Sequence, residues 1–242
     1  RGRPIGGGAL FIAGHAAIFY SGGQQFVIYA GLVQLFLLVW LFIAERRWIV
    51  IRDLLVIGAL TVHSDVAASD LVRKHLPGLA EAASLIGDMQ VRNRGTIGGS
   101  VAHADPGADF PVILTALNAA FVVQSTAGTR TISVDDFFTD FFTTAMSANE
   151  ILTEIHVPLP GAASGSAYTK LPHPASGYVV VSAGASITRQ ASGTCTASRI
   201  AIGGLGSGPL RAIATEMELQ GKPLTPQLIT SAPPSGSVSR SC

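Results

Sequence analysis

The sequence predicts an α+β protein that is built from two units. Short apolar strand patterns alternate with helix patterns over residues 54–165, whereas strand patterns dominate from about Ser166. The 242 residues suffice for one large domain or for two smaller domains with their own cores. Hydrophobic residues make up 48% of the chain and charged residues only 13%, so the apolar excess has to be located.

The apolar excess lies mainly in residues 26–44, FVIYAGLVQLFLLVWLFIA, which carry no charge. Glu45-Arg46-Arg47-Trp48 follows directly, and basic and aromatic residues are typical of a membrane interface. A transmembrane helix needs about 20 apolar residues, so the length is close to sufficient. Three interpretations stay open: a transmembrane helix, a buried helix or strand pair, and a stretch of misassigned residues.

The composition excludes several classes of function. The chain has 16 basic and 15 acidic residues without a basic run, so no nucleic-acid partner is predicted. Its two cysteines, Cys195 and Cys242, lie far apart and cannot hold an iron–sulfur cluster or a cysteine zinc site alone. No P-loop, G-x-S-x-G or H-E-x-x-H motif occurs, so neither a catalytic residue nor a metal ligand is predicted.

From residue 54 onward the pattern of apolar and turn residues predicts ordinary short elements. We expect the four phenylalanines of residues 135–146 to pack into the core from one helix. From Pro223 the chain turns to Pro and Ser, and residues 231–242, SAPPSGSVSRSC, are expected to form a disordered or truncated tail. The glycines at 203–208 miss the dinucleotide-binding spacing and indicate a plain connection. The expected strands are 54–60, 120–124, 130–134, 150–157, 167–171, 178–188 and 197–202, and the expected helices are 65–75, 77–86, 109–118, 135–146 and 210–219.

One polar and glycine-rich stretch stands out, residues 88–117, with Thr96-Ile97-Gly98-Gly99-Ser100 at its centre. Two adjacent glycines allow close approach of the backbone, and their N–H groups together with the flanking hydroxyls can cradle a phosphate or pyrophosphate. A tight turn before a helix would have the same pattern, and both interpretations stay open. Asp109 precedes the apolar run that starts at Phe110, the position expected of a helix N-cap.

The segment 90–111, QVRNRGTIGGSVAHADPGADFP, resembles the flavin-binding medium subunits of the molybdenum hydroxylases, most of all those of aerobic carbon monoxide dehydrogenases. The resemblance extends over residues 54–229 through VIGALTVHSDVAASDLV, ISVDDFFT, EILTEIHVP, KLPHPASGY and GKPLTPQLI. It implies a two-lobed FAD-binding α/β domain followed by a smaller C-terminal domain of antiparallel strands with helices. The expected divisions are 1–53 and 54–165 for the two lobes, and 166–242 for a C-terminal domain shorter than the family's.

The resemblance also implies which residues bind FAD. Thr96, Gly98, Gly99 and Ser100 would hold the pyrophosphate or ribityl region, and Asp109 would bind the sugar–phosphate part. Other implied contacts would line the path of FAD or touch its rings: Gly58, Ala59, Thr61, Val91, Gly95, Ile97, Leu152 on the isoalloxazine, Lys170 at its polar edge, and Tyr178 near it.

The family's second glycine loop, of the form A-G-G-x-S-L, is kept only in part here. Ala13, Gly14 and His15 stand in its place and are implied FAD contacts, but a glycine and the serine of the loop are missing.

The resemblance implies an electron-transfer subunit that works with a small [2Fe–2S] subunit and a large molybdenum subunit, as a dimer of heterotrimers. It further implies a quinone or cytochrome acceptor and a cytoplasmic location, at the inner face of the cell membrane where the acceptor lies there. The large subunit selects the substrate, so the flavin subunit of a purine or N-heterocycle hydroxylase stays open as an alternative. A membrane-anchored, non-enzymatic scaffold that uses residues 26–44 is the alternative from a different class.

Overall fold

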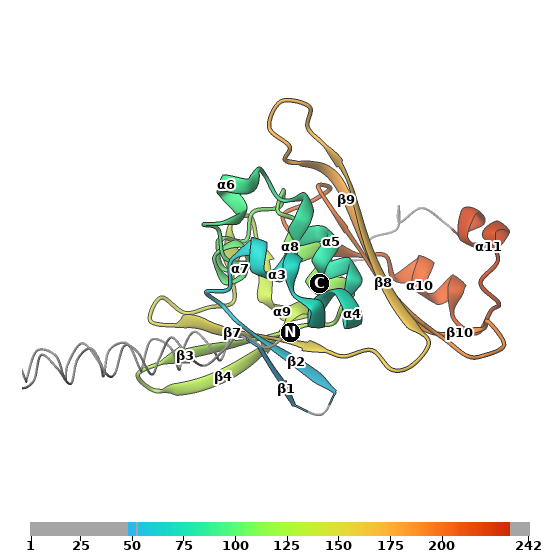
Figure 1. Cartoon of the computed structure of the whole chain (residues 1–242), viewed down its shortest axis with the longest axis horizontal. Helices are drawn as coiled ribbons and strands as arrows, with labels where there is room; N and C mark the ends of the chain where they lie inside the picture. Colours follow the sequence, from blue (N-terminus) through green and yellow to red (C-terminus); the bar gives the residue numbers. More distant parts are fainter. Residues whose placement is uncertain (1–47, 52, 233–242) are drawn as a thin grey trace, which may run out of the picture. The chain divides into compact units, whose positions relative to one another are not determined.

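The computed structural model describes residues 48–51 and 53–232, shown in colour in Figure 1. The expected contacts Ala13, Gly14 and His15 and the apolar run 26–44 therefore lie outside the described residues. None of the helices in the described part of the chain has the length and apolar character needed to cross a membrane.

The first sheet has five antiparallel strands in the order β1-β2-β7-β3-β4. Strand β2 lies between β1 and β7 and has a buried middle, which its run of Leu, Val and Ile explains. The predicted hairpin is confirmed, since β3 and β4 pair with Phe121 opposite Ile132. The bounds are β1 Trp48–Ile51, β2 Leu54–Gly58, β3 Ala120–Ser125, β4 Gly128–Ser133 and β7 Ile151–Pro158.

Six helices lie between β2 and β3 along the chain. The single helix predicted for 65–75 is wrong, because the chain becomes extended at Ser69 (φ −65°, ψ 122°) and the Ser69 hydroxyl accepts the N–H of Val72 as a new N-cap. The helix predicted from Pro77 is confirmed. The bounds are α3 His63–Ala68, α4 Asp70–His75, α5 Pro77–Leu85, α6 Met89–Arg92, α7 Ile97–His103 and α8 Asp109–Ala116.

The second sheet is antiparallel with the order β11-β10-β9-β8, and its three long strands confirm the predicted ones. The helix predicted to begin at Leu210 is wrong at its start, because Leu210 pairs with Ile202 of β10 and is part of a strand. After Pro223, Thr225 caps a short helix with Pro at its start. Residues 233–242 of the expected tail lie outside the described residues. The bounds are β8 Ser164–Pro172, β9 Val179–Arg189, β10 Cys195–Gly203, β11 Leu210–Arg211, α10 Ile213–Leu219 and α11 Pro226–Ser231.

The predicted phenylalanine helix over 135–146 is wrong. The chain forms the short helix α9 (Val134–Phe137) and then the hairpin of β5 (Phe138–Asp140) and β6 (Thr143–Thr144). Phe137 is fully buried, with its ring centroid 4.3 Å from that of Phe121. Phe141 and Phe142 are 60% and 57% exposed, because the chain turns at Phe142 with a positive φ of 49°. Only the first half of the aromatic group therefore serves the core.

Helices α3 to α8 lie between the two sheets, and one continuous core joins the sheets (Figure 1). Helix α8 is buried along its whole length and packs against α5, β9 and β10. Helix α5 reaches β8, where the backbone N–H of Gly78 donates to the Ser166 hydroxyl at 3.1 Å. This packing brings the start of α8 and the end of β8 together, and the candidate site lies there.

Candidate functional site

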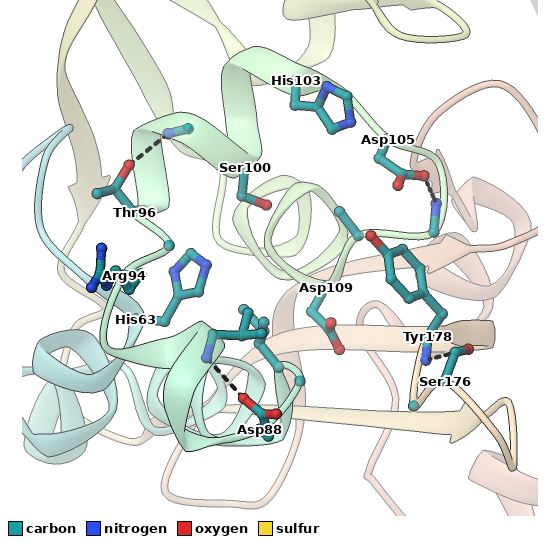
Figure 2. Close-up of a pocket in the computed structure, with 18 of the residues that line it drawn as sticks. His63, Asp88, Arg94, Thr96, Ser100, His103, Asp105, Asp109, Ser176 and Tyr178 are labelled. Carbon is teal, nitrogen blue, oxygen red and sulfur yellow. Dashed lines mark hydrogen bonds between the residues drawn. The ribbon is translucent and has the colours of Figure 1, made fainter.

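A cavity of about 790 Å³ opens beside the start of α7. Figure 2 shows its polar lining, with Arg94 and Thr96 on one side, Asp105 and Tyr178 on the opposite side, and Asp109 between them. Protein sites for small molecules and cofactors have about 300–1,000 Å³, so the size suits such a ligand. Eight predicted contacts line the cavity: Val91, Gly95, Thr96, Gly99, Ser100, Asp109, Lys170 and Tyr178.

The other predicted contacts within the described residues are not part of the lining, and all of them except the half-buried Gly58 are buried. They are Gly58, Ala59, Thr61, Ile97, Gly98 and Leu152. Gly98 shows why, because a Cβ there would lie 2.5 Å from the Cβ of Ala59 and 2.6 Å from its carbonyl oxygen. This glycine lets α7 pack against the end of β2, and thereby positions the residues that do face the cavity.

The two adjacent glycines lie within the first turn of α7, with Thr96 as the N-cap. The N–H of Ile97 donates to the Thr61 carbonyl at 2.9 Å, and that of Gly98 donates to the Ala59 carbonyl at 2.8 Å. The N–H of Gly99 donates to Thr96 Oγ1 at 3.1 Å. These N–H groups are therefore engaged by the chain itself. The groups that face the cavity for a ligand are side chains, including the Ser100 hydroxyl in Figure 2.

Asp109 does not cap α8 as predicted, because Ala108 is the N-cap residue and no side chain caps the helix. The carboxylate turns instead to the C-terminal sheet, where Oδ1 accepts the Tyr168 hydroxyl at 2.8 Å and lies 2.9 Å from Lys170 Nζ. The Lys170 and Asp109 side chains are only 5% and 7% exposed. Burial, together with the charge of Asp109, raises the pKa of Tyr168, so its hydroxyl stays protonated and donates.

The C-terminal domain also supplies the opposite wall. Tyr178 follows the end of β8 and is 58% exposed, and the Ser176 hydroxyl accepts its N–H at 3.3 Å. Gly107 lies against the tyrosine ring, while the Asp105 carboxylate accepts the Gly107 N–H at 2.8 Å. An exposed aromatic ring at a cavity wall provides a surface on which a planar ligand can stack.

Sequence reasoning missed several polar residues of the lining, among them His63 and Arg94. His63 is 5% exposed, and burial lowers its pKa to about 4, so the imidazole is neutral at pH 7. The Arg94 side chain makes no hydrogen bond or ion pair with any residue that the structure describes. Arg94 directly precedes the Gly95-Thr96 pair and could have been suspected, whereas His63 comes to the site only through the fold.

No three His, Cys, Asp or Glu side chains converge on a metal site within the described part of the chain. The cavity instead combines hydroxyls, one unpaired guanidinium and an exposed aromatic ring. Fold and cavity together define an α+β cofactor-binding protein whose C-terminal sheet completes the site.

Comparison with known families gives this class a name. A family model described as the FAD binding domain in molybdopterin dehydrogenase matches residues 14–160, and one described as the CO dehydrogenase flavoprotein C-terminal domain matches 166–235. The first match covers more than half of the chain, so the chain belongs to this family of FAD-binding domains. The family assignment confirms the predicted cofactor, FAD, and the resemblance to the medium subunits of molybdenum hydroxylases.

Individual relatives agree with this assignment. The carbon monoxide dehydrogenase medium chain of Hydrogenophaga pseudoflava is 40% identical over 177 residues, which are 73% of this chain and 61% of that one. The glyceraldehyde dehydrogenase medium chain of Sulfolobus acidocaldarius is 38% identical over 173 residues, 72% of this chain and 61% of that one. The chain thus spans about three fifths of the length of these relatives.

Solved structures show the same fold. A structure of carbon monoxide dehydrogenase from Hydrogenophaga pseudoflava matches with a TM-score of 0.72 and 40% identity, over 76% of this chain and 64% of that chain. Quinoline 2-oxidoreductase from Pseudomonas putida 86 matches with a TM-score of 0.70 and 31% identity over the same shares. The predicted combination of a FAD-binding domain with a C-terminal antiparallel domain is thereby confirmed.

The cavity fits the chemistry of FAD. Its volume of about 790 Å³ lies in the range for cofactors, and its unpaired Arg94 suits a phosphate. Gly95 is held close to His63, since a Cβ there would lie 2.5 Å from the imidazole Nε2. A larger residue would close this corner of the cavity.

Proposed function

We propose that this chain is the FAD-binding electron-transfer subunit of a multi-subunit molybdenum-containing dehydrogenase. The observation that carries the proposal is the cavity of about 790 Å³, where the Thr96–Ser100 segment and the Tyr178 loop face each other. Several relatives are named medium chains or medium subunits of dehydrogenases and hydroxylases, which supports a role as one subunit among several.

The residues of the cavity would bind and orient the cofactor. The hydroxyls of Thr96 and Ser100 would hydrogen-bond its polar middle, Tyr178 would stack on a ring, and Lys170 would remain paired with Asp109 at the floor. The remaining lining contacts proposed are Val91, Gly95 and Gly99, and the proposed supporting residues behind them are Gly58, Ala59, Thr61, Ile97, Gly98 and Leu152. When bound, FAD supplies the redox chemistry, taking up electrons and passing them on.

The proposal extends to partners. A large molybdenum subunit would oxidise the substrate, for which we propose carbon monoxide. A small subunit with two [2Fe–2S] clusters would deliver the electrons to FAD, and the three subunits would form a dimer of heterotrimers. The acceptor would be a quinone or cytochrome, and the complex would lie in the cytoplasm, at the inner face of the cell membrane where the acceptor lies there. The lobes and the C-terminal domain would divide at residues 53/54 and 165/166.

A second candidate is the flavin subunit of a hydroxylase that acts on an N-heterocycle. It is favoured by the names of further relatives: the nicotine 6-hydroxylase medium subunit at 34% identity, the nicotinate dehydrogenase FAD-subunit at 35% and caffeine dehydrogenase subunit beta at 28%. The binding residues would be the same, because the large subunit selects the substrate. Assaying the complex that copurifies with the chain on carbon monoxide and on nicotinate separates the two candidates.

The test of FAD binding uses the full chain. Purified protein should carry a flavin absorbance band near roughly 450 nm, or acquire it with FAD. Ser100→Ala should weaken FAD binding by about three- to tenfold through the loss of one neutral hydrogen bond. Ser84→Ala is the matched control, since Ser84 is exposed and bonds only its own helix, through the Glu81 carbonyl. Colourless protein that binds no added FAD would overturn the proposed function.

A further inference from the structure

His63 is a buried polar side chain that lines the cavity. Its ring packs edge-on against Phe110, with the centroids 5.1 Å apart, and the side chain is 5% exposed. Figure 2 shows the imidazole between Arg94 and Ser100, with Thr96 above it. Nδ1 is sealed from solvent and has no hydrogen-bond partner among the described residues.

The surroundings of the ring decide which nitrogen carries the proton. A neutral imidazole has one N–H donor and one bare acceptor nitrogen. A buried N–H group without an acceptor costs more free energy than a buried acceptor nitrogen without a donor. Buried donors without a partner are accordingly the rarer case in proteins. The proton therefore belongs on Nε2, which lies against Gly95: a Cβ on Gly95 would be 2.5 Å from it. Glycine at 95 keeps this donor accessible at the cavity wall.

The charges of the lining indicate which part of a dinucleotide this donor meets. The Asp88 carboxylate accepts the Val91 N–H at 2.8 Å and the Asp105 carboxylate lies on the far side, so both rims carry negative charge. Lys170 is paired with Asp109. Arg94 is thus the unpaired cation among the described lining residues, and it is adjacent in sequence to Gly95. A phosphate is attracted by Arg94 and repelled by Asp88 and Asp105, so its favoured position is the one nearest Arg94.

We propose that His63 and Arg94 form the phosphate-binding corner of the cavity, with His63 donating a neutral hydrogen bond from Nε2 to a phosphate oxygen of the bound dinucleotide. Arg94 contributes the charge. This inference rests on the proposed FAD function and gives a role to two lining residues that were not among the predicted FAD contacts.

The experiment compares two isosteric replacements in the full chain. The amide nitrogen of glutamine reaches the position of Nε2, whereas asparagine reaches only that of Nδ1. His63→Gln should keep the affinities for FAD and ADP within about threefold of wild type, and His63→Asn should weaken both about tenfold, the value of one neutral hydrogen bond. Riboflavin, which has no phosphate, should bind all variants equally. Equal ADP affinities of wild type and His63→Asn would overturn the inference.

Arg94 is tested in parallel. Arg94→Gln should weaken ADP binding by about tenfold or more at low salt and less at high salt, because a charge-assisted contact is lost. Arg73→Gln is the matched control, an arginine whose Nε donates to the Ala67 carbonyl outside the cavity. An equal effect of the two arginine variants would count against a phosphate-binding corner.

A direct readout keeps the inference testable even where a variant fails to fold. Nitrogen NMR of wild-type protein with labelled histidine should show His63 as the Nε2–H tautomer, with the Nε2 signal moving when ADP is added. A Nδ1–H tautomer, or a signal that ADP leaves unmoved, would overturn the inference. If wild-type protein binds FAD while the His63 and Arg94 variants bind ADP normally, only this inference fails. If wild type binds neither ligand, the proposed function fails too.

Discussion

The buried pair of Lys170 and Asp109 offers the sharpest test of how the two domains are held together. Lys170 on β8 and Asp109 at the start of α8 are 5% and 7% exposed, with Nζ 2.9 Å from Oδ1. Lys170→Met keeps the length and volume of the side chain but removes its charge. Among the described residues, the neutral Tyr168 hydroxyl would then be the remaining hydrogen-bond partner of the buried Asp109 carboxylate.

Removing one partner of a buried ion pair costs about 3–5 kcal/mol, because the remaining charge is left without compensation. A domain of this size has a total stability of about 5–15 kcal/mol, so the loss is a large share of it. At about 2–4 °C per kcal/mol, the melting temperature should fall by about 6–20 °C. Asp109→Asn combined with Lys170→Met removes both charges and should recover most of the loss.

Urea unfolding of the wild type, the two single variants and the double variant measures this coupling as a double-mutant cycle. Lys222→Met is the matched control, since Lys222 and its partner Glu218 are 46% and 43% exposed, and it should cost at most about 1 kcal/mol. A loss below about 1 kcal/mol for Lys170→Met, or a double variant whose loss equals the sum of the single losses, would refute the reasoning.

Two further predictions concern packing and pH. Gly78→Ala should destabilise the chain by about 1–3 kcal/mol in urea unfolding, because the added Cβ would lie 2.8 Å from the backbone nitrogen of Ala167. Gly165→Ala is the control, since its Cβ would have no neighbour within 4 Å, and it should change stability by less than about 0.5 kcal/mol. Burial lowers the pKa of His63 from 6.5 to about 4 in the folded chain, so the unfolded chain binds more protons than the folded chain between these pH values. The stability that depends on neutral His63 is therefore fully present above pH 6.5 and is lost as the pH falls toward 4. His63→Gln should flatten that part of the stability–pH curve measured by urea unfolding, and an unchanged curve would contradict the assignment.

Local patterns predicted most of the strands correctly. The hairpin of β3 and β4, the strand β7 and the three long strands of the C-terminal sheet each follow from alternating or continuous apolar residues between turn signals. Such patterns work because one strand face or both must be buried wherever the strand pairs. The helix at Pro77 was equally predictable, since proline favours the first turn of a helix.

The errors arose where a nonlocal contact outweighed the local pattern. Phenylalanines at 137, 138, 141 and 142 have helical spacing, but the chain reverses at Phe142 and only the first two contact Phe121. Asp109 has the local signature of an N-cap, but Tyr168 and Lys170 take its carboxylate from 59 and 61 residues away. A sequence pattern carries no information about a partner at that separation.

The sequence by itself determined the family, the cofactor and the stretch around Thr96-Ile97-Gly98-Gly99-Ser100 that forms one wall of the cavity. Only the tertiary structure decided how that stretch is used: Gly98 packs against Ala59, the N–H groups of the first turn bond within the chain, and side chains face the cavity. The tertiary structure also brought His63 and Tyr178 to the same cavity. The reason is physical, since residues far apart in the chain meet only when burial of the common core fixes the helices between the two sheets.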